Sequence, residues 1–167
     1  RIHILSRFED FQKTQKDQQD IINRMESLMS EGDSISEKFQ DLAQNMNQAI
    51  ADGKRKQWQA EAQRALDRQS ALEKEMSEIS ESMQSTIERM KGNDFVNLET
   101  VQKLQELNRL MNDIMTDELK DLLNQIRKQV ENVDLSGVDR KMLEAMKDQK
   151  KMNDSIDQTI RRLKRMK

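Results

Sequence analysis

Apolar residues recur along the chain at alternating spacings of four and three, and the clearest run lies between residues 58 and 90. This spacing places them on one stripe of an α-helix, at the positions called a and d in a heptad repeat. Neither glycine nor proline interrupts the run. We therefore predict a helix over about residues 54–91 whose stripe packs against other helices. The predicted stripe positions are Trp58, Ala62, Ala65, Gln69, Leu72, Met76, Ile79, Met83, Thr86 and Met90.

The same spacing predicts two helical segments before this helix, over residues 2–31 and 35–52. Gly32 is followed by Asp33 and Ser34, which is typical of a helix end and a new N-cap, so we expect a break there. Gln15 and Gln18 fall on the stripe of the first segment and weaken it. The stripe positions are Ile4, Phe8, Phe11, Gln15, Gln18, Ile22, Met25 and Met29 in the first segment, and Ile35, Phe39, Leu42, Met46 and Ala49 in the second.

Gly53 forms either a tight turn or a kink within a continuous helix. The phase of the stripe slips between Ala49 and Trp58, which favours a break or bend. A lone glycine costs a helix only about 1 kcal/mol, so the residue type alone does not decide between the two.

Two more helices are predicted after a turn at residues 91–94. The helix over residues 98–132 has the widest stripe, so we expect it to contact several neighbours at the centre of a bundle. Thr116, which precedes two acidic residues, is a candidate for a helix restart or kink. A break at residues 134–137 precedes the last helix, over residues 138–166. Its stripe contains Met142, Met146, Gln149, Asn153, Ile156, Ile160 and Leu163.

These patterns predict an all-α fold: an extended antiparallel helical bundle, with coiled-coil-like hairpins of four or five long helices, in one elongated domain over residues 1–167. The links between helices are short, which favours antiparallel neighbours. An apolar fraction of 34% and a charged fraction of 36% suit narrow seams better than a thick globular core. Proline is absent and aromatic residues make up 3%, which argues against a β-sandwich. The chain begins Arg-Ile-His rather than with Met, so we expect it to be an excised segment of a longer protein.

Little in the sequence points to catalysis. The one histidine, His3, lies at the start of the chain, where we expect it to be exposed, and there is no cysteine. The chain has neither a glycine-rich phosphate loop nor the Glu-x-x-His pairs of a di-metal bundle. We therefore expect no enzymatic activity, no cofactor and no metal. A net charge of −2 does not favour nucleic acid as a partner, and no apolar run is long enough to cross a membrane.

Polar, methionine and tryptophan side chains on the stripes are the candidate interaction residues. The twelve methionines form either an adaptable surface for a partner helix or gap-filling parts of the core, which we favour. The polar residues either set the register of pairing or mark where the bundle opens, and the sequence leaves both open. The tryptophan is either a binding hot spot or a core anchor, which we favour. These residues are Gln15, Gln18, Trp58, Gln69, Met76, Met83, Gln149 and Asn153.

The C-terminal end is strongly basic. Such an end can contact anionic lipid or another polyanion. We favour the alternative that these cations complement the helix dipole at a C-terminus. The candidate residues are Arg161, Arg162, Lys164, Arg165 and Lys167.

Several phrases in the second half of the chain resemble a known family. They are ETVQKLQELNRLM at residues 99–111, IMTDELKDL at 114–122, MLEAMK at 142–147 and DQTIRRLK at 157–164. From about residue 62 onward the chain is similar to the long helical region of large bacterial membrane-anchored envelope proteins, classed as a domain of unknown function. The resemblance supplies no catalytic or binding residues.

The resemblance implies a helical region on the periplasmic side of the bacterial cell envelope, attached to the membrane only by segments outside this chain. We expect a non-enzymatic scaffold or spacer whose partners are other protein helices or a second copy. The alternative is a lipid- or polyanion-binding helical module that uses the basic C-terminal end.

Overall fold

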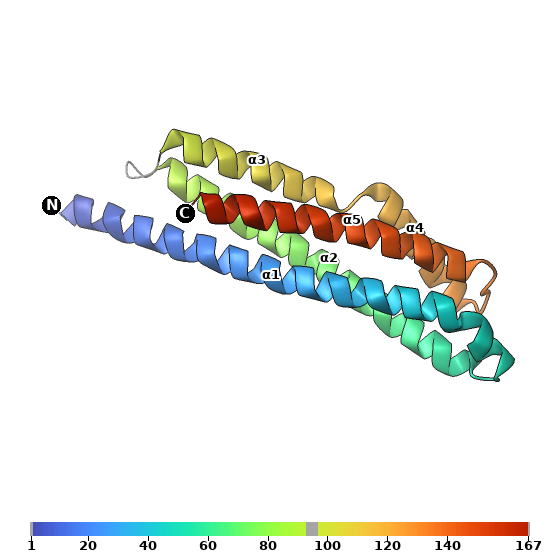
Figure 1. Ribbon diagram of the computed structural model, residues 1–167. Helices are drawn as coiled ribbons and strands as arrows, with labels where there is room; N and C mark the ends of the chain where they lie inside the picture. The colour runs from blue at the N-terminus through green and yellow to red at the C-terminus, as the bar shows by residue number, and fades with distance from the viewer. Residues whose placement is uncertain (1, 93–96, 167) are drawn as a thin grey trace. The chain divides into compact units, whose positions relative to one another are not determined.

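The structure, a computed structural model, describes residues 2–92 and 97–166; at the start of the chain, the described side chains are those of residues 8, 9 and 12 onward. Over these residues the chain forms five α-helices and no strand, so the fold is all-α (Figure 1). The side chains of His3, Ile4 and Phe11 lie outside the described part, as does Lys167. The helices are α1 (Ile2–Ala51), α2 (Arg55–Lys91), α3 (Leu98–Ile114), α4 (Asp117–Glu131) and α5 (Val138–Arg165).

Helix α2 confirms the pattern from which it was predicted. All ten stripe positions between Trp58 and Met90 are buried. Leu66 and Ile87, each next to a stripe position, are buried as well. An uninterrupted heptad spacing is therefore sufficient to predict both the helix and the face that it buries.

The predicted break at Gly32 is wrong. Helix α1 continues through this residue, and Gly32 is buried within it. Gly32 lies on the stripe, four residues after Leu28 and three before Ile35. Glycine in a helix costs about 1 kcal/mol. Because Gly32 has no side chain, α5 can pack closely against α1 at this position, and this packing offsets the cost.

The predicted phase of the first part of α1 is wrong only in part, because Gln18, Ile22 and Met25 are buried as predicted. Phe8 is 47% exposed and Gln15 is exposed, whereas Thr14, Ile21 and Leu28 are buried. The heptad spacing of the second half of α1 continues without interruption through Gly32 into the first half. Some stripe positions of the first half therefore lie one residue before the predicted ones. The buried stripe is Thr14, Gln18, Ile21, Met25, Leu28, Gly32, Ile35, Phe39, Leu42 and Met46.

Gly53 forms a turn rather than a kink. Helix α1 ends at Ala51 and α2 begins at Arg55, with Gly53 at φ +72°. The amide of Lys54 donates a hydrogen bond of 2.8 Å to the carbonyl of Ala49, which closes the end of α1. Glycine suits this position because it has no Cβ to clash in the left-handed conformation.

Thr116 divides the helix predicted over residues 98–132. It lies between α3 and α4 with extended backbone, and its Oγ1 accepts a 3.2 Å hydrogen bond from the amide of Leu119. Asp117 and Glu118 follow in the first turn of α4, where acidic side chains complement the helix dipole. The helix restart considered for Thr116 is therefore present, and the single central helix expected over residues 98–132 is not.

The helices group into two compact units, each assembled from separate parts of the chain. Unit 1 comprises Arg1–Leu28, Glu75–Ile114 and Ser155–Lys167; unit 2 comprises Met29–Lys74 and Met115–Asp154. Both units contain parts of α1, α2 and α5, to which unit 1 adds α3 and unit 2 adds α4. The prediction of a single domain stays a prediction.

Within each unit α1 and α2 are antiparallel. In unit 1 ion pairs join Asp17 to Arg89 and Arg24 to Glu75, so the residue numbers rise along one helix as they fall along the other. In unit 2 the pair between Lys38 and Glu61 fits the same direction. The α1–α2 turn and the α4–α5 turn, both in unit 2, lie at the same end of that unit (Figure 1).

Candidate functional site

The central feature of unit 2 is a buried polar cluster between α1 and α5. Gln149 and Asn153 lie one turn apart on α5, 0% and 4% exposed, and the Nε2 of Gln149 donates a 3.1 Å hydrogen bond to the Oδ1 of Asn153. The Nδ2 of Asn153 donates to the Oδ1 of Asp33 on α1 at 2.9 Å. Gln149 and Asn153, which the sequence singled out as candidate register residues, are therefore hydrogen-bonded to each other. They contact α1 at Asp33, next to the position where the sequence predicted a break.

Gly32 forms the notch that receives this cluster. A Cβ atom added at Gly32 would overlap the Oδ1 of Asn153 and lie 3.0 Å from both the Cγ of Asn153 and the Nε2 of Gln149. The hydroxyl of Ser36, one turn later, donates a 3.1 Å hydrogen bond to the carbonyl of Gly32. We call Gly32, Asp33, Gln149 and Asn153 the polar lock. Sequence reasoning missed its α1 half, although the spacing from Leu28 through Gly32 to Ile35 already placed the glycine on the stripe.

Gln69 on α2 is buried without the partners that its amide requires. It is 1% exposed, and neither its Nε2 nor its Oε1 has a hydrogen-bond partner among the described residues. The Oε1 of Gln149 is likewise buried with no hydrogen-bond partner among the described residues. Each such buried polar group costs about 1–3 kcal/mol relative to its solvated state. Gln149 offsets part of this cost through its hydrogen bond to Asn153, whereas Gln69 makes no side-chain hydrogen bond among the described residues.

A small polar cleft lies between α2 and α4 beside Gln69, with a volume of about 140 Å³. On its rim Arg127 pairs with Asp67 at 3.1 Å and donates to the hydroxyl of Ser70 at 3.0 Å. Burial raises the pKa of the Glu73 carboxyl, and the nearby charges of Lys120 and Arg127 oppose that rise. The residues that line the cleft are Leu66, Gln69, Ser70, Glu73, Lys120, Leu123, Asn124 and Arg127.

Trp58 fixes the first turn of α2 against α1 in unit 2. Its side chain is 3% exposed, and its indole Nε1 donates a 2.9 Å hydrogen bond to the carbonyl of Leu42. A buried indole that has its donor satisfied inside the chain has the geometry of an internal anchor. The ring has little surface left for a partner.

The remaining candidates on the stripes lie in unit 1. Met76 and Met83 are buried in α2. Gln18 is buried in α1, where its Nε2 has no hydrogen-bond partner among the described residues, and Gln15 is exposed. The two methionines therefore face the core of unit 1, where an unbranched side chain can fill irregular gaps.

Unit 1 also contains polar contacts that the sequence reasoning missed. The hydroxyl of Ser80 on α2 lies 3.0 Å from the Oδ1 of Asn108 and 2.6 Å from the Oδ1 of Asn112, both on α3, and its one hydrogen can be donated to either. Asn108, which is buried, donates in turn to the Oε1 of Gln84 at 3.2 Å. Asn108 lies four residues after Leu104 and three before Met111, so the heptad spacing could have identified it as an inward-facing residue.

Unit 1 also has a polar groove of about 280 Å³ between α1 and α2. Arg24 donates to Glu75 at 2.8 Å and to the hydroxyl of Ser82 at 3.2 Å, and Arg89 pairs with Asp17. Cations and carboxylates alternate across the groove, so it presents no surface of a single charge. Its lining residues are Asp17, Asp20, Ile21, Arg24, Ser82, Ser85, Thr86 and Arg89.

The basic C-terminal end is divided between paired and exposed cations. Lys164 forms a 2.6 Å ion pair with Glu26 on α1, and Arg161 pairs at 3.1 Å with Asp157 one turn earlier on α5. Arg162 and Arg165 are exposed. Lys167, the last residue of this predicted polyanion site, lies outside the described residues.

The described part of the chain contains neither a metal site nor a membrane-spanning helix. No group of His, Cys, Asp and Glu side chains there could hold a metal ion. No described helix is both long and apolar enough to cross a membrane. In comparisons with known proteins, no protein-family model, curated protein or solved structure matches the chain.

Proposed function

We propose that the chain is a non-enzymatic helical scaffold or spacer of a membrane-anchored bacterial envelope protein. The observation that supports this most directly is the stripe of α2, whose ten positions are buried by the chain's own helices. A helix of 37 residues spans about 55 Å at 1.5 Å per residue. With its apolar face covered internally, such a helix can hold two attachment points apart.

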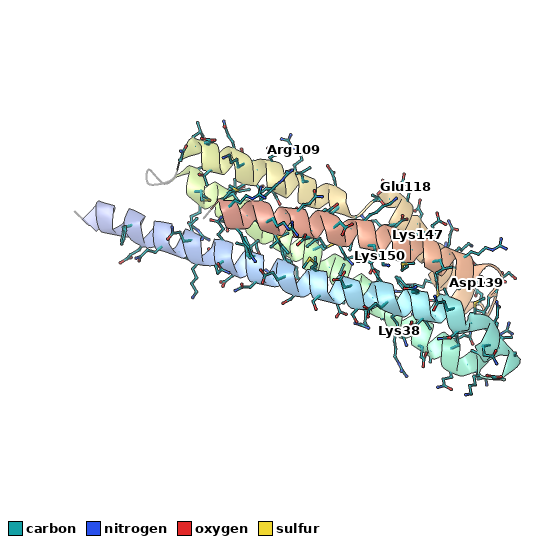
Figure 2. The ribbon with its side chains drawn as sticks, viewed as in Figure 1. Lys38, Arg109, Glu118, Asp139, Lys147 and Lys150 are labelled. Atoms are coloured by element: carbon teal, nitrogen blue, oxygen red, sulfur yellow. The ribbon has the colours of Figure 1, made fainter. Side chains whose placement is uncertain are left out.

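The charges on the outer surface favour a spacer over a protein that binds a ligand in a pocket. Charged side chains of both signs, including Arg109, Glu118, Lys147 and Lys150, project away from the helices (Figure 2). Mixed, exposed charges keep a helical segment in solution without marking one contact patch. We infer that partner helices contact the outside of this chain and do not enter its seams.

The proposed location rests on the family resemblance in the second half of the chain. It is tested by an antibody against this chain, used on membrane fractions and on spheroplasts of the source cell. We expect the antigen in the membrane fraction, where protease added to intact spheroplasts degrades it. Recovery in the soluble fraction, or protection from the protease, would contradict an envelope protein that faces the periplasm.

The alternative function is lipid or polyanion binding, which the exposure of Arg162 and Arg165 favours. It predicts that the chain co-sediments with vesicles containing anionic phosphatidylserine at low salt and is released as the salt concentration rises. Arg162→Glu/Arg165→Glu should abolish this binding, whereas Arg109→Glu/Lys147→Glu, with the same change in charge, should retain it. Equal binding by both variants, or no binding by the unchanged chain, would exclude this function.

A further inference from the structure

We propose that the polar lock fixes the register in which the α4–α5 hairpin pairs with the α1–α2 hairpin in unit 2. This inference goes beyond a spacer function, because it concerns how the chain selects one pairing among several. Gly32 provides the notch, and Gln149 and Asn153 provide the polar side chains that fill it.

Register needs such a device because heptad stripes can slip. A shift of seven residues brings one stripe position to the next, and apolar stripes that include methionine adapt to the shifted partner. Short turns fix α2 against α1 and α5 against α4, since only residues 52–54 and 132–137 separate the helices. The two hairpins are joined only through α3, which belongs to unit 1, so no turn within unit 2 fixes one hairpin against the other. The rim pair between Asp67 and Arg127 is partly exposed, and a pair of this kind contributes little.

The residues one heptad away show why a slipped register is unfavourable. If α5 moved by seven residues along α1, Asn153 would face Phe39 or Met25 instead of Gly32. Its amide would then be buried against apolar side chains and would lose the hydrogen bond to Asp33. In the same slip Met146 or Ile160 would face the notch, and neither would supply the polar contacts found there.

The lock resembles the buried asparagine of helical zippers, which selects a register at some cost in stability. Gln149 shows that cost, because its Oε1 is buried with no hydrogen-bond partner among the described residues. An apolar residue at that position would avoid the cost and would also remove the discrimination. A polar residue on an otherwise apolar stripe is therefore explained by pairing specificity.

Register can be measured in the full 167-residue chain, which has no cysteine of its own. Asp67→Cys/Arg127→Cys reports the native register, and Asp67→Cys/Lys120→Cys reports a register shifted by one heptad. Each pair is placed in the unchanged chain and in a chain carrying Gly32→Ala, Gln149→Leu and Asn153→Leu, and is treated with a short thiol cross-linker. In the unchanged chain the native pair should cross-link and the shifted pair should not.

Loss of the lock should raise the yield of the shifted pair relative to the native pair about tenfold, which corresponds to about 1.4 kcal/mol. The same ratio in both chains would overturn the proposal. Circular dichroism of each chain confirms that the helices are present, so a change in cross-linking reports pairing rather than loss of fold.

The single change Gly32→Ala provides a second test through the sign of its effect. Alanine favours a helix more than glycine does, so without a lock the urea midpoint should rise. With the lock, the new Cβ displaces the amide of Asn153 from its hydrogen bonds, and the midpoint should fall. Gly92→Ala, just after the end of α2, is the control for the same change at an exposed glycine, because its Cβ would meet nothing nearer than the carbonyl of Arg89 at 3.8 Å.

Gly32→Ala/Asn153→Ala keeps the test decisive if the single variant does not fold. Removal of the displaced amide should restore folding and raise the midpoint above that of Gly32→Ala. A rise in midpoint for Gly32→Ala alone, or no recovery in the double variant, would overturn the proposal.

Discussion

Units 1 and 2 are formed from the same three helices and a different fourth, yet they place their polar groups differently. In unit 2 Gly32, Gln149 and Asn153 of the polar lock are buried between α1 and α5, and Asp33 is exposed at its edge. The adjoining core contains Phe39 and Trp58, the two buried aromatic residues among the described side chains. In unit 1 Ser80, Asn108 and Asn112 join α2 to α3, where Asn108 is buried, Ser80 is half-buried and Asn112 is exposed. The stripes are alike, so the difference lies in the residues that interrupt them.

This comparison teaches that a heptad stripe specifies a helical bundle but not how strictly its helices pair. A buried polar group has few alternative partners and so penalises a wrong register, whereas a half-exposed one can exchange its partner for water. The buried Gln149 and Asn153 of unit 2 therefore penalise a wrong register, as the buried Asn108 does in unit 1, whereas the contact between Ser80 and Asn112 can exchange with water.

The largest effect should come from removing an aromatic side chain from each unit. Phe39→Ala should lower the free energy of unfolding by about 3–5 kcal/mol, because a fully buried ring leaves a cavity. Phe8→Ala, the same change at a half-exposed site, should cost less than about 1 kcal/mol. Urea titrations followed by circular dichroism and by Trp58 fluorescence measure both. Equal losses would remove the distinction between the two sites.

Trp58→Phe should lower the free energy of unfolding by about 1–2 kcal/mol, since a buried hydrogen bond contributes about 0.5–1.5 kcal/mol and part of the ring volume is lost. Circular dichroism in urea measures the loss. In the unchanged chain, the emission of the tryptophan should be blue-shifted and should move to the red as unit 2 unfolds. Red-shifted emission from the folded chain would contradict the internal anchor.

Gln69→Leu should raise the free energy of unfolding by about 1 kcal/mol, because it removes two buried amide atoms that lack partners. Gln15→Leu, at an exposed position of α1, should leave it within about 0.5 kcal/mol. Urea midpoints compare the two. If Gln69→Leu were destabilising, the glutamine would contribute an interaction that the described contacts do not contain.

The smallest effect concerns Glu73, whose pKa in the folded chain is raised by burial and partly lowered again by Lys120 and Arg127. A carboxyl with a raised pKa stabilises the fold fully below its unfolded pKa of about 4.3 and loses that contribution as the pH rises through the folded pKa. Glu73→Gln should therefore stabilise unit 2 at neutral pH by a few tenths of a kcal/mol, because solvent screens a half-exposed group.

The test of Glu73 is a pair of urea titrations, at neutral and at acidic pH, with Glu37→Gln, at an exposed position in the middle of α1, as control. The gain from Glu73→Gln should disappear at acidic pH, where the native carboxyl is already neutral. A gain that grows on acidification would give the opposite sign and contradict the assignment to burial.

The sequence predicted most of the helices because their stripes depend on local spacing alone. All ten stripe positions of α2 were predicted correctly, as were the seven on α5 from Met142 to Leu163. Gly32 was misread because the two local signals conflict: glycine favours a helix end, while the spacing favours a continuous stripe. The residue that resolves the conflict is Asn153, 121 positions away in sequence, and no local pattern reports that contact.

The same limit applies to the candidate sites. Gln149 and Asn153 could be singled out as polar residues on an apolar stripe, but the notch that receives them could not. The roles given to the methionines and to Gln18 stay predictions, since burial shows where a side chain lies and not what it recognises. The groove residues of unit 1 gave no sequence signal, because serines and arginines on a helix surface are common.

Multi-angle light scattering of the isolated chain over a wide concentration range tests most directly whether its stripes are covered within one molecule. We predict a constant mass of 19.7 kDa at every concentration, because the buried stripes of the described residues leave no apolar seam there to join a second copy. A dimer or larger species that dissociates only as helicity is lost would contradict this. The stripes would then be the interface between copies, and assembly would be their function.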